Sequence, residues 1–366
     1  MKFETLRETL LSPVQAVAGV VERRQTMPIL ANLLLAAGDA GLAVTATDTE
    51  IELVATASVD VREKGEVTVP ARKLLDICRA LPEGVKVVVA LDKGKLTLHS
   101  GHSRFSLATL PAADFPLVED IKPERSFRVT QAKLRDLFAR TAFSMAQQDV
   151  RYYLNGLLLE VGEQQLRAVA TDGHRLALCD LKAAFGGNGT QQVIVPRKSV
   201  LELQRLMGEH DEEVSIDLGT NHIRVTMTGI RLISKLIDGR FPEYERVVPK
   251  GGDKILNASR AELYEALHRA AILSNEKYRG VRLQLGAKNL KVLAHNPEQE
   301  EAEDEIEIQY QGGDLEIGFN VTYLLEALSA LDQERVQITL TDANNSCLIS
   351  APENELCRYV VMPMRL

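Results

Sequence analysis

Residues 155–172 read NGLLLEVGEQQLRAVATD, and this stretch decides the fold because the chain carries it three times. An earlier copy, NLLLAAGDAGLAVTATD, occupies residues 32–48, and a weaker copy, GVRLQLGAKNLKVLAHN, occupies residues 280–296. The last residues of successive copies lie 124 positions apart. Solenoid and propeller repeats span roughly 20–50 residues, so the repeated unit here is a whole domain.

The segment downstream of each copy repeats as well. VTVPARKLLDICRAL at 67–81 returns as VIVPRKSVLELQRLM at 193–207 and as IGFNVTYLLEALSAL at 317–331. Several segments therefore keep their order and nearly their spacing, which indicates that one module was copied twice.

Turn-forming residues gather at two places between the copies. These are FPLVEDIKPE at 115–124 and PKGGDK at 249–254. Such clusters mark connections between folded elements. We therefore predict three domains, at 1–122, 123–252 and 253–366.

Each copy shows the same order of helices and strands. Residues 85–110 alternate apolar and polar side chains around a tight turn at Asp92 to Gly94, which predicts an antiparallel meander. Two helices packed on antiparallel strands make each domain α+β rather than a parallel βαβ design. The apolar periodicity predicts helices at 6–20, 70–81, 131–145, 196–207, 259–273 and 320–331.

Composition narrows the class of protein. The 366 residues are 45% apolar and 26% charged, which excludes a largely disordered chain and a collagen-like chain. No apolar run is long enough to cross a bilayer, and MKFETLRETLL does not read as a secretory signal, so we expect a cytoplasmic protein. Cys78, Cys179, Cys347 and Cys357 show no paired spacing, and we expect reduced, mostly buried thiols.

Two clusters can be interpreted as catalytic. Asp172 and His174 could act as a general base pair, although a turn in which Asp172 accepts backbone hydrogen bonds explains the same residues. The acidic run Glu298–Glu305 could hold magnesium, form a solvated face, or dock on a basic patch of another subunit. No phosphate loop, dinucleotide fingerprint, HExxH or GxSxG motif is present.

The net charge is −8, so nucleic acid would be attracted only where positive charge gathers on one face. At 100° per residue, the helix at 70–81 separates an apolar side from a side that carries Arg72, Lys73 and Arg79. Lys198 and Arg205 return at equivalent positions of the second copy, and Arg197 adds a charge. Repeated domains that curve so that such helices line a hole would hold duplex DNA by encirclement, with few sequence-blind phosphate contacts.

Several longer segments carry a family resemblance. They are TLPAADFP, FSMAQQDVRYYLNG, VATDGHRLA, VPRKSV, SKLIDGRFPEY, AAILSNEKYRGVRL, NPEQEEAEDE and the terminal YVVMPMRL. Together they resemble the bacterial DNA polymerase III beta subunit, the replicative sliding clamp, from end to end of the chain.

The resemblance implies a fold and a function. The fold is the DNA-clamp fold, α+β, in which three repeated domains close as a head-to-tail dimer ring around duplex DNA. The function is that of a DNA polymerase processivity factor with no catalytic activity and no cofactor or metal. Its partners are the replicative polymerase, the clamp loader and other replication or repair proteins that present short linear motifs, with no membrane partner.

The resemblance also implies site residues. Arg24, Arg72, Gln148, Tyr152 and Tyr153 would contact DNA, beside Arg197, Lys198 and Arg205 from the helix pattern, although either tyrosine could instead pack under its loop. The partner-peptide groove would comprise Leu154, Thr171, Gly173, His174, Arg175, Leu176, Pro242, Arg246, Val247, Asn320, Tyr323, Ser346, Val360, Met362, Pro363, Met364 and Arg365. The dimer interface would join Lys73, His102, Arg104, Phe105 and Leu107 to Ile272, Leu273, Glu298, Glu300, Glu301 and Asp304.

One departure from the family pattern lies in that interface. His102 stands where the family has an arginine, and histidine titrates near neutrality, so this contact is expected to be weaker or pH-dependent. Two other functions compete with the clamp. An enzyme would lose turnover when Asp172 or His174 is replaced, and a sequence-specific DNA binder would select one preferred site.

Overall fold

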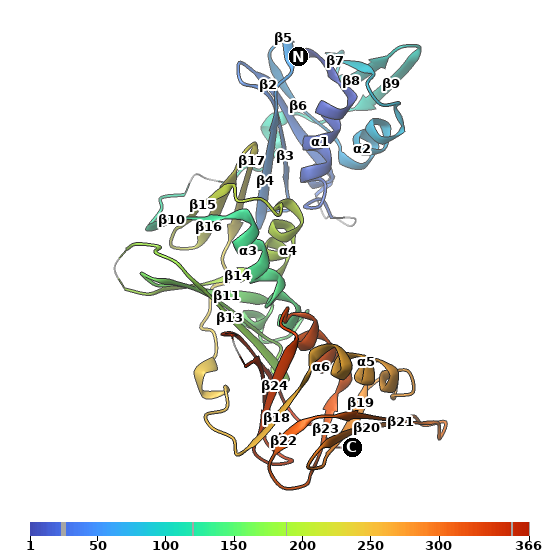
Figure 1. Cartoon of the computed structure of the whole chain (residues 1–366). Coiled ribbons are helices and arrows are strands. Elements are labelled where there is room, and N and C mark those ends of the chain that lie inside the picture. The colour runs from blue at the N-terminus through green and yellow to red at the C-terminus, as the bar shows by residue number, and fades with distance from the viewer. Residues whose placement is uncertain (23–26, 119–120, 188, 353, 366) are drawn as a thin grey trace. The chain divides into compact units, whose positions relative to one another are not determined.

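The computed structural model describes residues 1–22, 27–118, 121–187, 189–352 and 354–365 (Figure 1). The chain forms two compact units. Unit 1 comprises Met1–Ala132 with Leu201–Leu236, and unit 2 comprises Lys133–Val200 with Ile237–Leu366. In the described part of the chain, each helix is too short or too polar to span a membrane.

The three repeated stretches form three hairpins with one pattern of pairing. In the first copy, β2 (Asn32–Gly38) pairs with β3 (Gly41–Thr47), and β6 (Gly65–Pro70) pairs along the other edge of β2. The same pattern joins β11 (Gly156–Val161), β12 (Gln165–Thr171) and β14 (Gln191–Pro196), and then β19 (Gly280–Leu285), β20 (Asn289–His295) and β23 (Leu315–Asn320). Equivalent sequence therefore adopts equivalent structure.

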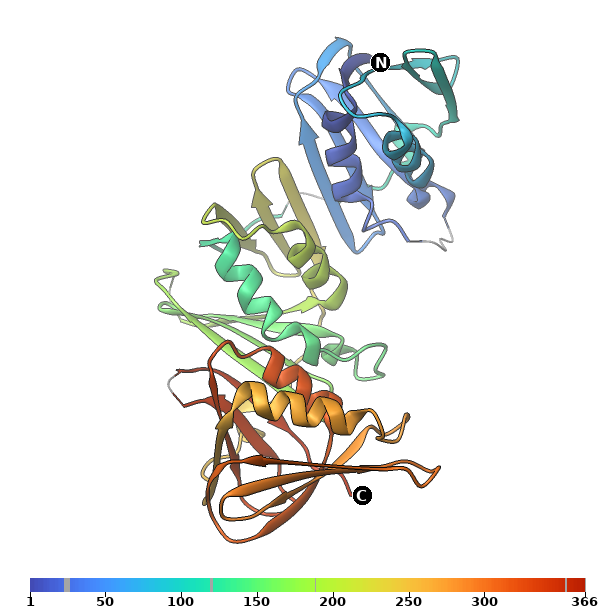
Figure 2. The same ribbon diagram turned by 45° about the vertical axis from the view of Figure 1, so that its right-hand side comes forward.

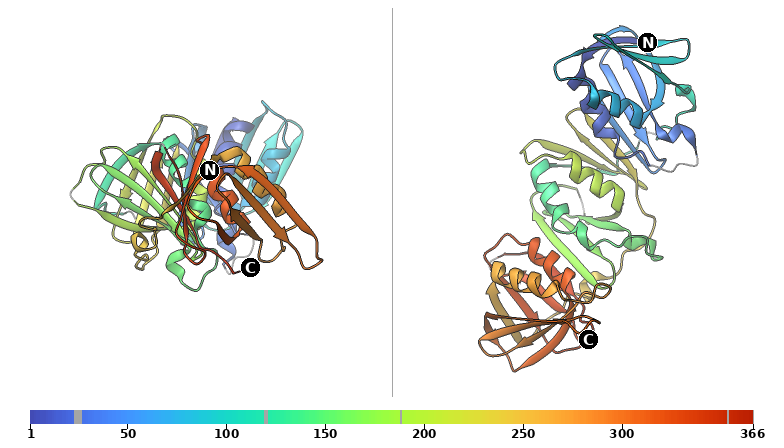
Figure 3. Two further views of the ribbon diagram at one scale, coloured as in Figure 1. Left: turned by 60° about the horizontal axis from the view of Figure 1, so that its bottom comes forward. Right: turned by 90° about the vertical axis from the view of Figure 1, so that its right-hand side faces the viewer.

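The six predicted helices all form, and each is shorter than predicted. In α1 (Arg7–Val17) the buried Leu10, Val14 and Val17 make one apolar stripe, which packs on β3 and on β4 (Ile51–Ala57), beside α2 (Ala71–Ala80) (Figure 1). In unit 2, α5 and α6 lie against one another over the sheets (Figures 2 and 3). The observed bounds are α1 Arg7–Val17, α2 Ala71–Ala80, α3 Gln131–Ala139, α4 Arg197–Leu206, α5 Arg260–Ala271 and α6 Val321–Ser329.

The predicted meander at 85–110 is confirmed in unit 1. Lys93 and Gly94, both at positive φ, connect β7 (Lys86–Asp92) to β8 (Lys95–Ser100), as a tight hairpin with right-handed strand twist requires. Unit 1 holds a five-stranded sheet of order β5-β1-β7-β8-β9 and an eight-stranded sheet of order β10-β15-β16-β17-β4-β3-β2-β6. The further strands are β1 Lys2–Leu6, β4 Ile51–Ala57, β5 Asp60–Glu63, β7 Lys86–Asp92, β8 Lys95–Ser100, β9 Ser103–Ala108, β10 Arg125–Thr130, β15 Glu213–Leu218, β16 His222–Met227 and β17 Ile230–Lys235.

Unit 2 holds a nine-stranded sheet and a four-stranded sheet. Their orders are β14-β11-β12-β13-β26-β25-β24-β18-β22 and β21-β20-β19-β23. The strands not yet given are β13 Arg175–Lys182, β18 Lys254–Ser259, β21 Glu301–Glu307, β22 Gln309–Gln311, β24 Arg335–Leu340, β25 Cys347–Ala351 and β26 Asn354–Val361.

Two strand pairs connect one sequence repeat to the next. Antiparallel pairing of β17 with β4 joins the second repeat to the first, and pairing of β13 with β26 joins the third repeat to the second. Because sheets run across the repeats, the two compact units do not follow the three predicted domain boundaries, which stay a prediction.

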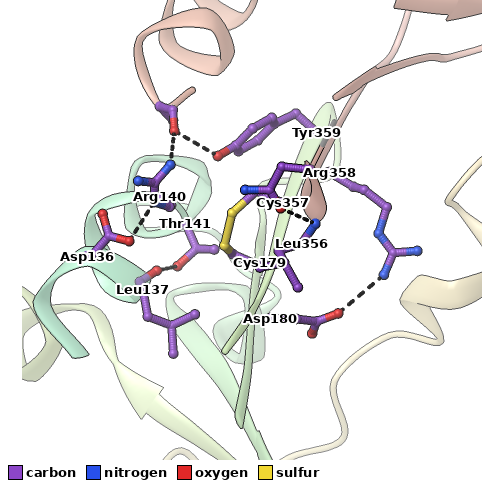
Figure 4. Close-up of a disulfide and its surroundings, with 12 residues drawn as sticks. Asp136, Leu137, Arg140, Thr141, Cys179, Asp180, Leu356, Cys357, Arg358 and Tyr359 are labelled. Atoms are coloured by element: carbon purple, nitrogen blue, oxygen red, sulfur yellow. Dashed lines mark hydrogen bonds and ion pairs between the residues drawn. A yellow bond between two sulfur atoms is a disulfide. The ribbon is translucent and has the colours of Figure 1, made fainter. Parts of the chain in front are cut away.

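The expectation of four reduced cysteines is wrong for one pair. Cys179 of β13 and Cys357 of β26 form a disulfide (Figure 4). These residues face one another directly in the strand register, with Cα atoms 4.1 Å apart. The sequence gives no local sign of this pairing because 178 positions separate the two cysteines.

Cys78 and Cys347 are free and buried, as predicted. Burial raises the pKa of the Cys78 thiol to about 11 and that of the Cys347 thiol to about 12. An apolar site disfavours the thiolate, so both groups are neutral at neutral pH.

Candidate functional site

The segment Thr171–Arg175 forms a tight turn between β12 and β13. The Asp172 carboxylate accepts hydrogen bonds from the backbone N–H of His174 (2.9 Å) and of Arg175 (3.1 Å). The Thr171 hydroxyl donates to the carbonyl oxygen of Arg175 (2.6 Å). Gly173 has φ +89°, which favours glycine. These contacts confirm the turn interpretation of the Asp172 cluster, since the carboxylate is committed to the backbone.

Arg175 ties this turn to the third repeat. Its Nε donates to Asp172 (3.1 Å), its Nη2 donates to the carbonyl oxygen of Phe143 (2.7 Å), and its Nη1 pairs with Glu326 of α6. The guanidinium also lies 4.4 Å from the ring centroid of Tyr323 on α6. The arginine side chain is therefore held from several sides and fixes the turn against α6.

A cavity of about 170 Å³ lies beside the turn in unit 2. Part of its lining belongs to a buried apolar cluster that includes Leu176, Tyr244 and Val360. The predicted groove residues that line it are Leu154, Thr171, Gly173, His174, Arg175, Leu176, Pro242, Val247, Val360 and Met362. An apolar floor edged by polar groups is typical of a site that takes apolar side chains of a ligand.

The remaining predicted groove residues lie outside this cavity. Asn320 caps α6 by accepting a hydrogen bond from the N–H of Thr322 (2.9 Å), and Tyr323 lies under Arg175. Arg246 is 81% exposed and pairs with Glu243. The C-terminal segment is fixed in place, since the N–H of Met364 donates to the carbonyl oxygen of Gly318 (2.9 Å). Ser346 precedes β25, and Pro363 and Arg365 flank Met364; these three residues are not part of the cavity lining.

Three cavity residues were not predicted for this site: Arg151, Tyr153 and Tyr244. Asp149 holds Arg151 through two hydrogen bonds of 3.0 and 2.8 Å, and these bonds lower the pKa of Asp149 to about 2. Tyr244 lies two residues after Phe241-Pro242, a pair that repeats Phe115-Pro116, so the repeat was a sequence signal close to this residue. Only the folded structure shows that the Tyr244 ring lines the cavity.

The residues predicted to contact DNA fall into two groups. Arg72, Gln148 and Tyr152 are exposed, and Gln148 has φ +56° at the tip of its loop. Tyr153 instead packs against the apolar cluster of the cavity, as the alternative for one tyrosine foresaw. Arg24 lies outside the described residues.

The basic residues of α4 make contacts within the protein. Arg197 donates to the carbonyl oxygen of Met145 (3.2 Å), and Arg205 pairs with Glu202 (2.6 Å). Lys198 is half-buried. The equivalent face of α2 is open, because Arg72, Lys73 and Arg79 are exposed while Leu74 and Cys78 are buried.

The predicted interface residues lie on two sheet edges and their surroundings. Arg104, Phe105 and Leu107 belong to β9, the last strand of the five-stranded sheet, with His102 in the preceding turn. Glu301 and Asp304 belong to β21, the last strand of the four-stranded sheet. Glu298 and Glu300 precede β21, Lys73 is exposed on α2, Ile272 is 72% exposed after α5, and Leu273 is half-buried.

Similarity to known proteins covers the whole chain. Residues 1–119, 128–243 and 245–365 match the N-terminal, central and C-terminal domains of the DNA polymerase III beta subunit. The chain is 55% identical to the beta sliding clamp of Pseudomonas aeruginosa and 50% identical to that of Escherichia coli, with each chain covered completely. It is also similar to the crystal structure of the DNA polymerase III subunit beta from Pseudomonas aeruginosa, with a TM-score of 0.96 at 55% identity and full coverage of both chains.

Proposed function

The chain belongs to the DNA polymerase III beta subunit family, and on this premise we propose that it is a DNA polymerase processivity factor. It acts as a ring-shaped homodimer that encircles duplex DNA, slides on it and tethers the polymerase without catalysing a reaction. We place this activity in the cytoplasm, where replication occurs in bacteria.

The strand junctions between repeats carry the proposal of a ring. The pairs β17 with β4 and β26 with β13 join equivalent strands of consecutive repeats. β9 is the strand of the first repeat that corresponds to β17, and β21 is the strand of the third repeat that corresponds to β4, so we expect β9 to pair with β21 of a third repeat. In the described residues each of these two strands has only one neighbouring strand. A second copy supplies the missing strand at both ends, so the chain closes head to tail.

The repeat also predicts the register of this intermolecular pair. Arg231 of β17 pairs with Val54 of β4, and the hairpin registers make Arg104 on β9 and Glu303 on β21 their equivalents. Opposite charges facing one another across strands stabilise pairing. We therefore expect Arg104→Glu to weaken the dimer in sedimentation velocity across a dilution series, and the double variant with Glu303→Arg to restore it. A dimer unaffected by Arg104→Glu would contradict this register.

Encirclement explains how an acidic protein holds DNA. A topological link needs few phosphate contacts, and few contacts allow sliding because each one adds to the salt-dependent cost of movement. The open basic face of α2 supplies such contacts without base readout. Partner proteins dock in the cavity beside Thr171–Arg175 through short motifs that carry apolar side chains.

Retention on DNA of different topology tests the ring. The protein is loaded on a nicked circular plasmid by a clamp loader and ATP, separated by gel filtration, and treated with a restriction enzyme that linearises the plasmid. We expect protein to stay with the circle and to leave the linear form. Equal retention on both forms would contradict encirclement and favour a gripping DNA binder.

Replacement of cavity residues tests the docking site separately. We expect Met362→Ala to lower the affinity of a fluorescent motif peptide several-fold, since it removes apolar contact area in the lining. The matched control is Met227→Ala in unit 1, which removes a buried methionine from another place. Unchanged peptide affinity in Met362→Ala would contradict the placement of the docking site in this cavity.

A further inference from the structure

A second cavity, of about 430 Å³, lies on the nine-stranded sheet of unit 2. It has no assigned role. Its floor includes Leu178, Arg358, Ser350 and Gln337, which follow one another across β13, β26, β25 and β24 in the strand register. Residues on one such row project from the same face of a sheet, so the row forms a continuous polar surface beside Leu178.

The second cavity adjoins the groove cavity. The next row on the same face contains Leu176 and Val360, which line the groove, followed by Leu348 and Thr339, which line the second cavity. Two residues along an antiparallel strand correspond to about 7 Å. A peptide that fills the groove can therefore place a residue from just beyond its motif in the second cavity.

Tyr244 is the wall that both cavities share. From the side of the second cavity, Arg167 donates to the Tyr244 hydroxyl (3.1 Å), and that hydroxyl lies 3.3 Å from Glu160. The position of the Tyr244 ring is thus set by hydrogen bonds as well as by apolar packing.

On the floor of the second cavity, Arg358 has no close carboxylate partner of its own. Asp180 forms a two-pronged pair with Arg167, with distances of 2.6 and 2.9 Å. Arg358 reaches the same carboxylate only at 3.6 Å, and Figure 4 shows it extending toward Asp180 and away from Tyr359. Arg167 also lies 3.8 Å from Glu245, whereas the only carboxylate within 4 Å of Arg358 among the described residues is the one that Arg167 already binds.

The guanidinium of Arg358 also has N–H donors that are not used within the described part of the protein. Among the described residues its Nε has no hydrogen-bond partner, and no other nitrogen of its guanidinium donates a hydrogen bond. A guanidinium offers five N–H donors, arranged to match a carboxylate. Lys250, Glu245 and Glu355 line the edge of the cavity, and all three are exposed to solvent.

We propose that the second cavity binds the carboxylate of an acidic residue that flanks the motif of a partner peptide. This inference rests on the proposed docking function of the groove. Arg358 holds the carboxylate, Ser350 and Gln337 offer a hydroxyl and an amide on the same row, and Tyr244 separates this subsite from the apolar one.

Fluorescence anisotropy with four synthetic peptides tests the proposal. Each contains the same apolar motif, extended by three residues at its N-terminal or C-terminal end, with either Glu or Gln in the extension. We expect the Glu peptide extended at one end to bind about fivefold more tightly than its Gln counterpart, the size of one partly exposed ion pair. Equal affinities for Glu and Gln at both ends would overturn the proposal.

Variants of Arg358 assign the effect to this cavity. Arg358→Gln should abolish the preference for Glu, and Arg358→Lys should retain most of it, while the Gln peptides bind all proteins alike. The control is Arg282→Gln, which removes a comparably exposed arginine of an ion pair on β19 of the same unit. A Glu preference that survives Arg358→Gln would overturn the proposal, whereas failure of all four peptides to bind the unaltered protein would contradict the groove itself.

Discussion

The chain contains one turn twice, and only one of the two copies lines a cavity with a proposed role. At Thr47–Ile51 in unit 1, the Thr47 hydroxyl donates to the carbonyl oxygen of Ile51 (2.8 Å), and Asp48 accepts from the N–H of Glu50 (2.9 Å) and of Ile51 (2.8 Å). Thr171, Asp172 and Arg175 make the same set of bonds in unit 2. The shared Thr-Asp pair therefore specifies a turn and not a function.

The two turns differ at the third and fifth positions, whose side chains make none of the shared hydrogen bonds. The third position is Thr49 in unit 1 and Gly173 in unit 2, and both have positive φ, of 78° and 89°. The fifth position is the buried Ile51 in unit 1, whereas in unit 2 it is Arg175, which pairs with Glu326. The two turns thus keep the same backbone bonds and differ in the contacts of the fifth residue.

Removing the aspartate from each turn gives the largest expected effect. Asp48→Ala and Asp172→Ala each lose two hydrogen bonds to a charged acceptor, which costs about 2 kcal/mol of unfolding free energy. Only Asp172→Ala also loses a contact of Arg175, so only this variant should weaken binding of the motif peptide. Urea unfolding and fluorescence anisotropy measure the two quantities. Equal loss of peptide affinity in both variants would break the comparison.

A side chain at Gly173 should have a smaller effect that is also specific to the second turn. A Cβ atom there would lie 2.9 Å from the guanidinium nitrogens of Arg151, which lines the groove cavity. Because alanine would meet this close contact and also a left-handed backbone conformation, we expect Gly173→Ala to lower the unfolding free energy by about 1 kcal/mol. We also expect it to lower the affinity for the motif peptide. Thermal unfolding and peptide titration test this. Peptide affinity equal to that of the unaltered protein would show that Arg151 has no part in docking.

The reverse change in the first turn should stabilise the protein slightly. Thr49 is β-branched and has φ 78°, a conformation that glycine adopts without steric cost. We expect Thr49→Gly to raise the unfolding free energy by about 0.5 kcal/mol, because relief of strain exceeds the entropy that glycine adds to the unfolded chain. Peptide affinity should not change. Destabilisation would show that Thr49 makes a contact that offsets its strain.

The smallest expected effect is the alkylation of the two free cysteines, of which one is buried in each unit. Burial raises the pKa of Cys78 in unit 1 to about 11 and of Cys347 in unit 2 to about 12. Only the thiolate reacts with iodoacetamide, and a raised pKa keeps the thiol neutral up to higher pH. Alkylation should therefore be negligible at pH 8 and should increase only as the pH approaches these pKa values. Mass spectrometry after iodoacetamide treatment measures it. Rapid labelling of either native thiol at pH 8 would contradict its burial.

Local sequence patterns predicted the repeated elements well. The six helices and the meander follow from apolar periodicity and turn residues, because neighbouring residues determine which face of an element is buried. The helix ends were predicted too far out because apolar periodicity does not report where the backbone hydrogen-bond ladder stops. The groove residues on Thr171–Leu176 came from the family resemblance, on a motif that is continuous in sequence.

The sequence by itself determined three copies of one α+β module and the turns within them, since these depend on contacts among residues close in the chain. Only the tertiary structure decided that Cys179 faces Cys357, that Tyr244 separates two cavities, and that Arg358 shares Asp180 with Arg167. Each of these depends on the pairing of strands from different repeats. That pairing is set by the register between β13 and β26, and no periodicity within either strand encodes it.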